Sequence, residues 1–390
     1  PKLSEGFILN QATGLVRHGH ELDLYVRNPP SDSIVADEVE SFGLLHNCLL
    51  ARMRAAHAQT LARLTGRAPA RFLARQHAKL CSRKIYPSGP RRHFTAQPYD
   101  AIHAQFGELG LYALELREAG LINGPLLTAF RGIDLTQRIR ERGQDYYDNL
   151  FQQGDVFLPS CHYFRNLLVG LGCPDEKITV LYSSTDLERF RFRKRDFQAR
   201  PFRLISICRL VPKKGISCVL DALAELKATP ESYCYTIAGD GPRRKELEAQ
   251  VRDLALTGVV HFVGATGNEE LVQLLHESHV LLAPSQTPES GDQDGAANSP
   301  KEAAATGMPV IVTRHGGLPE VVEDGRTGFV LSEGDSHALA RTITQLSEAP
   351  HLCDQMGRQG AERVKQCFSS KRLYAQQENI YMQAVSGSSS

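Results

Sequence analysis

Residues 294–310 read DGAANSPKEAAATGMPV and place two carboxylates, Asp294 and Glu302, eight residues apart. This spacing predicts that the two acids straddle a loop and the first turn of a helix. The backbone N–H groups of Gly295 to Ser299 would lie between them, where they are able to hydrogen-bond a phosphate or a hydroxyl group. The pattern therefore predicts a ligand-binding loop that leads into a helix.

A second candidate site lies upstream, where an expected strand at residues 203–207 runs into the basic loop CRLVPKKG, residues 208–215. Arg209 and Lys214 would lie beside the N-terminus of the next helix, a position that favours anions. The donor fork of Arg and the point charge of Lys suit a diphosphate. The residues alone leave a second interpretation open, a surface pair that caps local carbonyl groups.

Two further strands end in glycine, where the backbone is able to approach a ligand closely. Gly239 follows the expected strand 235–238, and Gly264 follows Phe262 and Val263. Glycine turns after strands are common, so neither turn is specific by itself.

Short apolar strands alternate with helical stretches along most of the chain, which predicts parallel sheets covered on both faces. The expected strands are 22–26, 100–103, 126–130, 155–158 and 179–182, and then 203–207, 235–238, 259–263, 280–283 and 310–313. Two such series predict an α/β protein with two doubly wound domains and a ligand site in the cleft between them.

The expected boundaries are a first domain at 1–183, a polar linker at 184–200, a second domain at 201–368 and a helix at 369–385 that packs back on the first domain. Residues 4–18 have a helix-like pattern, whereas an α/β half-domain normally opens with a strand. We therefore expect that a first strand is missing upstream.

Composition excludes several classes of protein. The 390 residues include 45 Lys+Arg, 44 Asp+Glu and 42% hydrophobic residues. A net charge of +1 argues against a protein that coats nucleic acid, and plentiful apolar residues argue against disorder. No run of 18 apolar residues predicts a membrane-spanning helix. The nine cysteines form no C-x-x-C pair or Cys/His cluster, which favours reduced thiols over disulfides or a zinc site and predicts no bound metal.

The near-neutral charge conceals a basic segment at residues 41–99, which contains eleven basic residues and no acidic one. The remaining 34 basic and 44 acidic residues give the rest of the chain a charge of −10. The segment has the apolar spacing of amphipathic helices, which predicts a membrane-surface or anion-binding face. The alternative is a solvated helical face whose charge neighbouring acids balance.

Taken together, these motifs resemble those of the retaining glycosyltransferases of family 4, which have the GT-B fold of two facing Rossmann-like domains. The resemblance covers nearly the whole chain. It rests on the order of RLVPKKG from Arg209, GDGP from Gly239, FVG from Phe262, the acid-x7-Glu run, TGMPV from Thr306 and GGLPE from Gly316. SEGFILNQ from Ser4 and IHAQFG from Ile102 resemble the exopolysaccharide-biosynthesis branch.

The resemblance implies a role for each matched position. Glu302 would hold the ribose of the donor, Asp294 would bind the transferred sugar, and Arg209 and Lys214 would neutralise the departing diphosphate. The other donor-binding positions implied are Gly239, Phe262, Val263, Gly264, Gly295, Ala296, Ala297, Asn298 and Ser299. The acceptor-side positions implied are Ser4, Glu5 and His103.

Three departures from the family pattern change these expectations. Asp294 stands where Glu is usual and is one methylene shorter, and Ala297 stands where the loop commonly has Pro. Arg131 stands where many relatives have a His that contacts the donor sugar. We expect Arg131 to bind sugar or phosphate, the alternative being a structural pair with Asp134.

Other motifs are rejected. Asp292-Gln293-Asp294 has the D-x-D form that holds a metal ion in another glycosyltransferase fold, but Arg209 and Lys214 would already supply the countercharge, so metal-independent transfer is expected. The two carboxylates also resemble the pair of a glycosidase, which needs an acid and a base flanking a scissile bond, and this second interpretation is rejected too. No G-x-G-x-x-G follows a strand, so a dehydrogenase has little support.

The sequence thus predicts a retaining hexosyltransferase without a cofactor, which uses a UDP- or GDP-sugar and a glycan or lipid-linked glycan acceptor in exopolysaccharide or heteropolysaccharide biosynthesis. The alternatives are a nucleotide-sugar epimerase of the same fold and a catalytically silent nucleotide-sugar-binding protein. We expect no nucleic-acid partner and a cytoplasmic location, peripheral on the inner face of the plasma membrane if the basic segment 41–99 binds anionic lipid.

Overall fold

The computed structural model describes residues 99–118 and 122–387, together with Gln11, Leu15, His20 and the short parallel strands β1 (Leu24–Tyr25) and β2 (Leu45–His46). Ser4 and Glu5 lie outside the described residues, as does nearly all of the basic segment 41–99. No helix in the described part is long and apolar enough to cross a membrane.

The N-terminal half contains a parallel three-stranded sheet in the order β3-β4-β5. Its elements are β3 (Ile102–Ala104), α5 (Gly107–Glu118), β4 (Leu126–Phe130), α6 (Gln137–Arg142), α7 (Asp148–Gln153), β5 (Val156–Pro159) and α8 (His162–Gly170). All five residues of β4 are buried, as expected for a strand covered on both faces. Phe130 of β4 packs in one apolar cluster with Tyr147, Phe151 and Phe157.

The C-terminal half contains a parallel six-stranded sheet in the order β11-β10-β9-β6-β7-β8. Its strands are β6 (Phe202–Ile207), β7 (Tyr233–Ala238), β8 (Val260–Gly264), β9 (Val280–Ala283), β10 (Val310–Thr313) and β11 (Gly328–Leu331). From β6 the chain builds outward through β7 and β8, and from β9 it builds in the other direction. The strand order therefore reverses between β6 and β9, which is where doubly wound sheets bind ligands.

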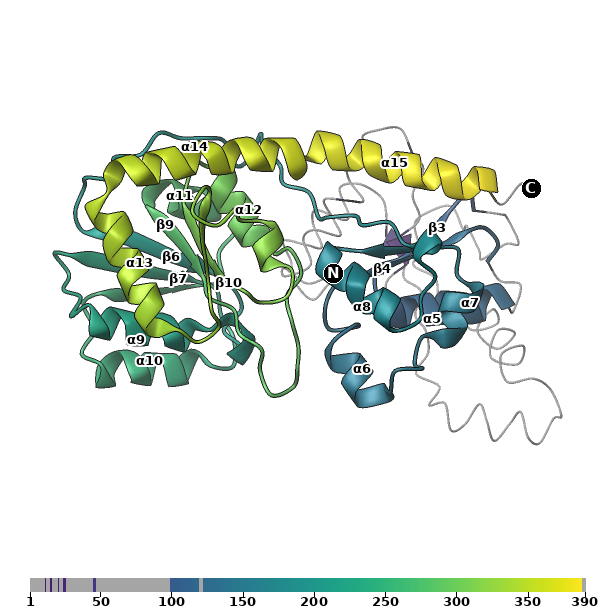
Figure 1. Ribbon diagram of the computed structural model, residues 1–390, viewed down its shortest axis with the longest axis horizontal. Coiled ribbons are helices and arrows are strands. Elements are labelled where there is room, and N and C mark those ends of the chain that lie inside the picture. Colours follow the sequence, from purple (N-terminus) through teal and green to yellow (C-terminus); the bar gives the residue numbers. More distant parts are fainter. Residues whose placement is uncertain are drawn as a thin grey trace, which may run out of the picture.

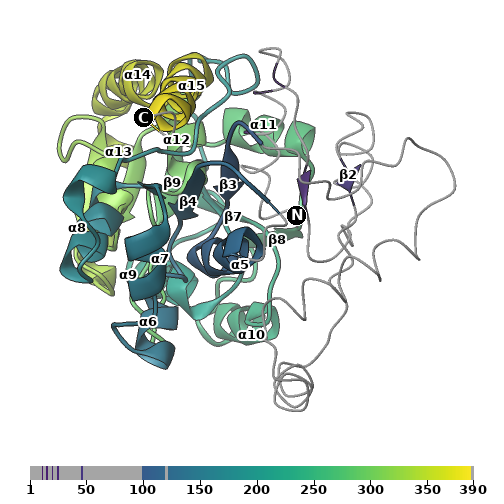
Figure 2. The ribbon, with the colours of Figure 1, turned by 90° about the vertical axis from the view of Figure 1, so that its right-hand side faces the viewer.

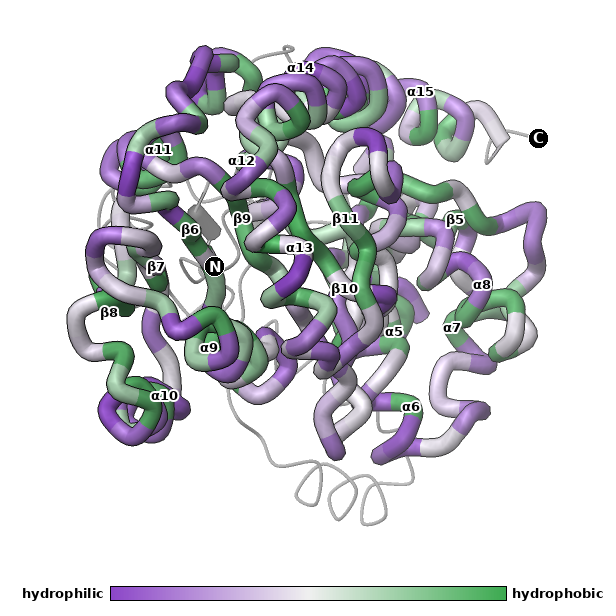
Figure 3. Tube along the Cα trace, turned by 60° about the vertical axis from the view of Figure 1, so that its left-hand side comes forward, coloured by the Kyte–Doolittle hydropathy of each residue, from purple (hydrophilic) through white to green (hydrophobic). Residues whose placement is uncertain are grey.

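Side chains alternate between the two faces of this sheet and so build two cores. Ile205 and Leu281 face α11 (Asn268–Glu277), α12 (Asn298–Ala305) and α14 (Pro350–Cys367). Leu204 and Leu282 face the opposite layer of α9 (Ile216–Glu225), α10 (Arg244–Asp253) and α13 (Ser336–Glu348). Figure 3 shows the mostly hydrophobic strands β9, β10 and β11 among helices in which hydrophilic and hydrophobic residues alternate.

The two halves are joined by two crossings of the chain. The first precedes β6, and there the buried Arg195 donates hydrogen bonds to the backbone oxygens of Ser278 and Leu275. The second leads from α14 into α15 (Ser370–Gly387), which reaches across to the N-terminal half (Figures 1 and 2). There Ile380 packs against Leu127 and Leu158.

The two sheets confirm the predicted α/β class, and the strands at 126–130, 280–283 and 310–313 have the predicted bounds. One prediction was wrong, and two strands, β2 and β11, were missed. Residues 179–182 form no strand, although the N–H groups of Thr179 and Leu181 donate to β5. Strand β11 was not predicted because four residues after a polar turn carry little periodicity, and pairing with β10 defines it.

Candidate functional site

The loops that follow β6 and β9 meet where the strand order reverses. The loop after β6 ends in a short 3-10 turn, η3 (Pro212–Lys214), and then turns at Gly215 into α9. Gly215 has φ +63°, and a Cβ there would overlap the carbonyl oxygen of Pro284 at the end of β9. Only glycine therefore allows the basic loop to lie against the loop that carries Asp294.

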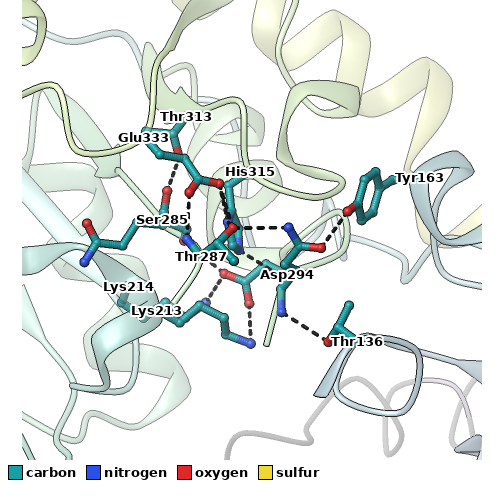
Figure 4. A network of polar contacts seen from close by, with 12 residues as sticks. Thr136, Tyr163, Lys213, Lys214, Ser285, Thr287, Asp294, Thr313, His315 and Glu333 are labelled. Carbon is teal, nitrogen blue, oxygen red and sulfur yellow. Dashed lines mark hydrogen bonds and ion pairs between the residues drawn. The ribbon is translucent and has the colours of Figure 1, made fainter. Parts of the chain in front are cut away.

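The carboxylate of Asp294 is the centre of a cluster of charged and polar groups (Figure 4). The Nζ atoms of Lys214 and Lys213 lie 2.8 Å and 3.1 Å from its two oxygens. The Ser285 hydroxyl donates to Oδ2 over 2.9 Å. Asp294 and Lys214, 80 residues apart in the chain, are thus in direct contact.

The charge states in this cluster follow from its contacts. Burial alone would raise the pKa of Asp294, but Lys214 and Lys213 outweigh burial and hold that pKa well below its ordinary value. Burial opposes the charge of Lys214, and Asp294 raises the pKa of this lysine above its ordinary value nonetheless. The site therefore contains a permanent carboxylate paired with cations.

Lys213 is a member of this cluster that the sequence did not single out. Its Nζ also lies 2.8 Å from Asp292 Oδ2, so one lysine bridges both acids of the D-x-D sequence. The sequence could not show which of the two adjacent lysines faces the site. In the structure, the 3-10 helical turn directs both side chains toward Asp294. Arg209 belongs to the same loop and is exposed.

The backbone of Asp294 is also bound. Its N–H donates to Nε2 of the buried His315 over 3.0 Å, and its carbonyl accepts from the Gly317 N–H over 2.9 Å. Glu333 Oε1 lies 2.8 Å from His315 Nδ1. His315 and Glu333 were not among the predicted residues. The adjoining Gly316-Gly317 motif was the only sequence signal near them.

Glu302 lies in the first turns of α12 in a very different environment. Burial raises the pKa of its carboxyl to about 7, although Lys301 and then Arg189 counteract this effect. No hydrogen bond joins the carboxylate to another of the described residues. Lys301 points elsewhere: its Nζ donates to the carbonyl and hydroxyl oxygens of Ser183, at 2.6 and 2.8 Å. Burial lowers the pKa of Lys301 to about 7.

The remaining donor-binding candidates lie around these loops. Gly239 (φ +137°) and Gly264 (φ +81°) form a β-bridge at the ends of β7 and β8. Val263 is exposed. Phe262 lies beneath the guanidinium of Arg244, 5.8 Å from its ring centre. In the Asp294 loop, Gly295 and the buried Ala296 pack against the N-terminal half, and Ala297 immediately precedes α12. Asn298 accepts from the Ser183 hydroxyl, and Ser299 is partly buried.

Arg131 follows β4 in the N-terminal half. Its guanidinium donates to Gln105 Oε1 over 2.5 Å and to Gln11 Oε1 over 3.1 Å. Asp134 instead accepts from the backbone N–H groups of Arg131, Gly132 and Gly107. Asp134 thus holds the turn through its backbone, and the guanidinium extends toward Gln105, which follows β3, and toward Gln11.

His103 in β3 is tied to the C-terminal helix. Its Nδ1 lies 2.6 Å from the Tyr381 hydroxyl of α15, which also accepts from Gln377. Burial, with a smaller effect of Arg131, lowers the pKa of His103 to about 3. His103 is therefore neutral at physiological pH.

The two halves are in contact at the Asp294 loop. Tyr163 of α8 donates through its hydroxyl to Gln293 Oε1 over 2.5 Å, and the Gln293 N–H lies 3.3 Å from Thr136 Oγ1. Glu320 accepts the N–H groups of His162 and Tyr163 at the start of α8. The loop that carries Asp294 therefore lies against the N-terminal half.

Comparisons with known proteins agree with this arrangement. Residues 5–183 match the glycosyl transferase 4-like domain, and residues 188–363 match the group 1 glycosyl transferases. A Salmonella typhimurium glycosyltransferase named for colanic acid biosynthesis, WcaL, is 31% identical over 96% of both chains. The chain belongs to glycosyltransferase family 4. The amylovoran biosynthesis glycosyltransferase AmsK of Erwinia amylovora is 35% identical over 64% of this chain and 61% of its own.

Solved structures show the same fold. The Anabaena protein Alr3699/HepE, crystallised with UDP-glucose, superposes with a TM-score of 0.72 at 19% identity, over 99% of this family 4 chain and 96% of its own. The predicted GT-B architecture and the predicted family are therefore confirmed, and the enzyme is a glycosyltransferase.

Proposed function

We propose that this glycosyltransferase moves a hexose, with retention of configuration and without a metal ion, from a nucleoside-diphosphate sugar to a glycan acceptor in exopolysaccharide assembly. The observation that carries the proposal is the contact of Asp294 with Lys213 and Lys214 at the point where the strand order reverses. This position is the one at which parallel α/β sheets bind nucleotides.

The lysines and Arg209 would bind the diphosphate of the donor. A diphosphate competes with Asp294 for the same ammonium groups, so its arrival would loosen the Lys214–Asp294 contact and free carboxylate oxygens for the sugar hydroxyls. Negative charge grows on the leaving phosphate in the transition state, where fixed cations stabilise it most. Lys214 and Arg209 would act on that charge.

Glu302 would bind the ribose. Hydroxyl groups donate to a carboxylate, and the Glu302 carboxylate has no competing hydrogen bond from a described residue. Its pKa of about 7 implies that donor binding would favour loss of its proton. Gly239, Phe262, Val263 and Gly264 would lie near the base, and residues 295–299 near the sugar and phosphate.

Two features support retention without a metal. Lys213 bridges Asp292 and Asp294, and Lys214 also contacts Asp294, so two lysines already balance the charge of the D-x-D pair. In the donor complex Lys213 and the sugar hydroxyls would still engage the Asp294 oxygens, which would make its carboxylate a weak nucleophile and disfavour a covalent intermediate. We propose front-face transfer: the bond from the acceptor oxygen to the sugar C1 forms as the C1–phosphate bond breaks, and the acceptor proton passes to the leaving phosphate oxygen.

The relatives named for colanic acid and amylovoran biosynthesis support an exopolysaccharide acceptor, glycan or lipid-linked. The N-terminal half would hold this acceptor near Arg131, His103, Ser4 and Glu5. The basic segment 41–99, outside the described residues, would bind an anionic membrane surface. The UDP-glucose held by the Anabaena protein makes a UDP-sugar the first donor to test, with a GDP-sugar next.

The decisive experiment measures nucleoside diphosphate release from a panel of UDP- and GDP-sugars, with and without a lipid-linked glycan extract and with EDTA present. We expect release with one base only, dependence on the extract, resistance to EDTA and an α-linked product from an α-linked donor by NMR. Isomerised donor without acceptor would instead support an epimerase. Tight nucleotide binding without turnover would support a silent binding protein.

A further inference from the structure

The imidazole of His315 lies beside Asp294 and is completely buried. Its Nε2 faces the Asp294 N–H, 3.0 Å from the nitrogen, and its Nδ1 faces Glu333 Oε1 at 2.8 Å (Figure 4). A backbone N–H only donates, so Nε2 must accept. The proton of the neutral ring therefore lies on Nδ1, which donates to Glu333.

Glu333 is held in turn from the loop after β9. Its carboxylate accepts the Thr287 N–H over 2.7 Å and the Thr287 hydroxyl over 3.1 Å. Because the two Thr287 donors fix the Glu333 carboxylate, the His315 ring has one favourable orientation in which Nδ1 donates to Glu333. Partners of this kind orient histidines in other sites by the same means.

The turn that contains His315 binds both backbone polar groups of Asp294. His315 accepts the N–H, and Gly317 donates to the carbonyl over 2.9 Å. Gly316, with φ +50°, lets this turn approach, because a Cβ there would overlap the same carbonyl oxygen. Since Asp is one methylene shorter than Glu, the backbone position largely decides where the carboxylate lies.

We propose that His315 is a positioning residue for Asp294, which sets through the Asp294 N–H the place where the carboxylate meets the sugar of the donor. The inference rests on the role of Asp294 in the proposed function. His315 does not itself touch the donor, because its side chain has no exposed surface. Its contribution is one accepted hydrogen bond in a fixed direction.

Two substitutions separate the two contacts of His315. In His315→Gln the amide oxygen is able to reach the position of Nε2 and accept the Asp294 N–H. In His315→Asn the shorter amide is able to replace only Nδ1 and donate to Glu333. A role in positioning Asp294 predicts that Gln rescues and Asn does not, whereas a role in holding Glu333 predicts the reverse.

The readout is the ratio of the dissociation constants of UDP and UDP-glucose by calorimetry, because this ratio isolates the contribution of the sugar. We expect His315→Asn to lower the ratio roughly tenfold and His315→Gln to keep it within about threefold, with UDP affinity unchanged in both. Equal ratios in both variants, or equal losses for UDP itself, would overturn the inference.

Hydrogen exchange of the Asp294 amide tests the contact without any ligand. In His315→Asn this amide should exchange faster than in the native protein, and in His315→Gln it should remain protected. Unchanged protection in His315→Asn would also overturn the inference. Glu333→Ala is the second variant if His315→Asn does not fold, and it should give faster exchange because the ring loses its orienting partner.

His337→Asn is the matched control. His337 also pairs with a glutamate, at 2.6 Å from Glu225, but on the exposed surface of α13. In His337→Asn we expect no change in the ratio of the UDP and UDP-glucose dissociation constants or in the hydrogen exchange of the Asp294 amide. If native protein binds neither UDP nor UDP-glucose, a UDP-sugar donor is excluded, and the exchange measurement still decides the role of His315.

Discussion

Asp294 and Glu302 lie eight residues apart in one motif, yet their surroundings are opposite. Asp294 contacts two lysines and a serine hydroxyl, whereas Glu302 receives no hydrogen bond from a described residue. Despite burial, the lysines depress the pKa of Asp294 strongly, while burial raises the pKa of Glu302 to about 7. One acid is a permanent anion and the other ionises near neutral pH.

The difference shows that a sequence motif determines where two carboxyl groups lie in the chain but not their ionisation state. Lys301 is next to Glu302 in sequence but donates to Ser183, 118 residues away. Lys214 is 80 residues from Asp294 and binds it directly. Pairing across the fold therefore decides which carboxylate is neutralised.

The largest expected effect is that of Asp294→Asn. Loss of the carboxylate removes the proposed sugar contact and leaves Lys213 and Lys214 without their shared partner. We expect a loss in kcat of roughly 10²- to 10³-fold and a free energy of unfolding lower by about 3 kcal/mol, measured by nucleotide release and denaturant titration. Asp292→Asn, which leaves Lys213 paired with Asp294, is the control, and an equal loss there would contradict the assignment.

Glu302→Gln should weaken nucleotide binding while stabilising the free protein at neutral pH. The ribose loses a charged acceptor, which we expect to raise the dissociation constant of UDP about tenfold by calorimetry. The fold no longer buries a carboxyl that ionises at a cost, so the melting temperature should rise. Glu348→Gln, an exposed change at the end of α13, should alter neither quantity. Unchanged UDP affinity in Glu302→Gln would exclude the ribose role.

The pH dependence of binding should separate the two acids. The folded pKa of Glu302 is raised above its unfolded value, so its contribution to stability is fully present below about 4.5 and is lost as pH rises toward about 7. Nucleotide binding has the opposite slope, because the carboxylate is the better acceptor. UDP affinity should increase between pH 6 and 8 in the native protein. A slope that persisted in Glu302→Gln would assign it to another group.

The smallest expected effect is that of Lys301→Met. Met has a similar volume, and the lysine charge is already weakened by burial, so the free energy of unfolding should change by only about 1–2 kcal/mol. Lys301 lowers the pKa of Glu302, so its loss should move the pH midpoint of UDP binding upward. Lys365→Met, an exposed change on α14, should leave the midpoint in place. A downward shift in Lys301→Met would contradict the coupling.

Much of the fold was predictable from sequence because each buried parallel strand is a local apolar run. Strands 126–130, 280–283 and 310–313 were found in this way. Residues 179–182 have the same local pattern but lie at the margin of β5 and form no strand. Strand β11 has little pattern and exists through its pairing with β10.

The residues of the candidate site also fall into two groups, those that local sequence indicated and those that only contacts across the fold identify. Residue types and spacing pointed to Asp294, Glu302 and Lys214, because these residues lie in loops, or in the helix that follows such a loop, after recognisable strands. They did not point to Lys213, His315 or Glu333, whose importance comes from contacts with Asp294 and with one another. The guanidinium of Arg131 likewise met Gln105 and Gln11, while Asp134 bound the backbone.

By itself, the sequence determined the parallel α/β class, the order of the loops and the eight-residue spacing of the two acids, since these follow from periodicity and chain order. Only the tertiary structure decided which strands are neighbours, and hence which cations meet which carboxylate. Ionisation depends on burial and on charges within a few ångströms, and for Asp294 these charges come from lysines far away in the chain.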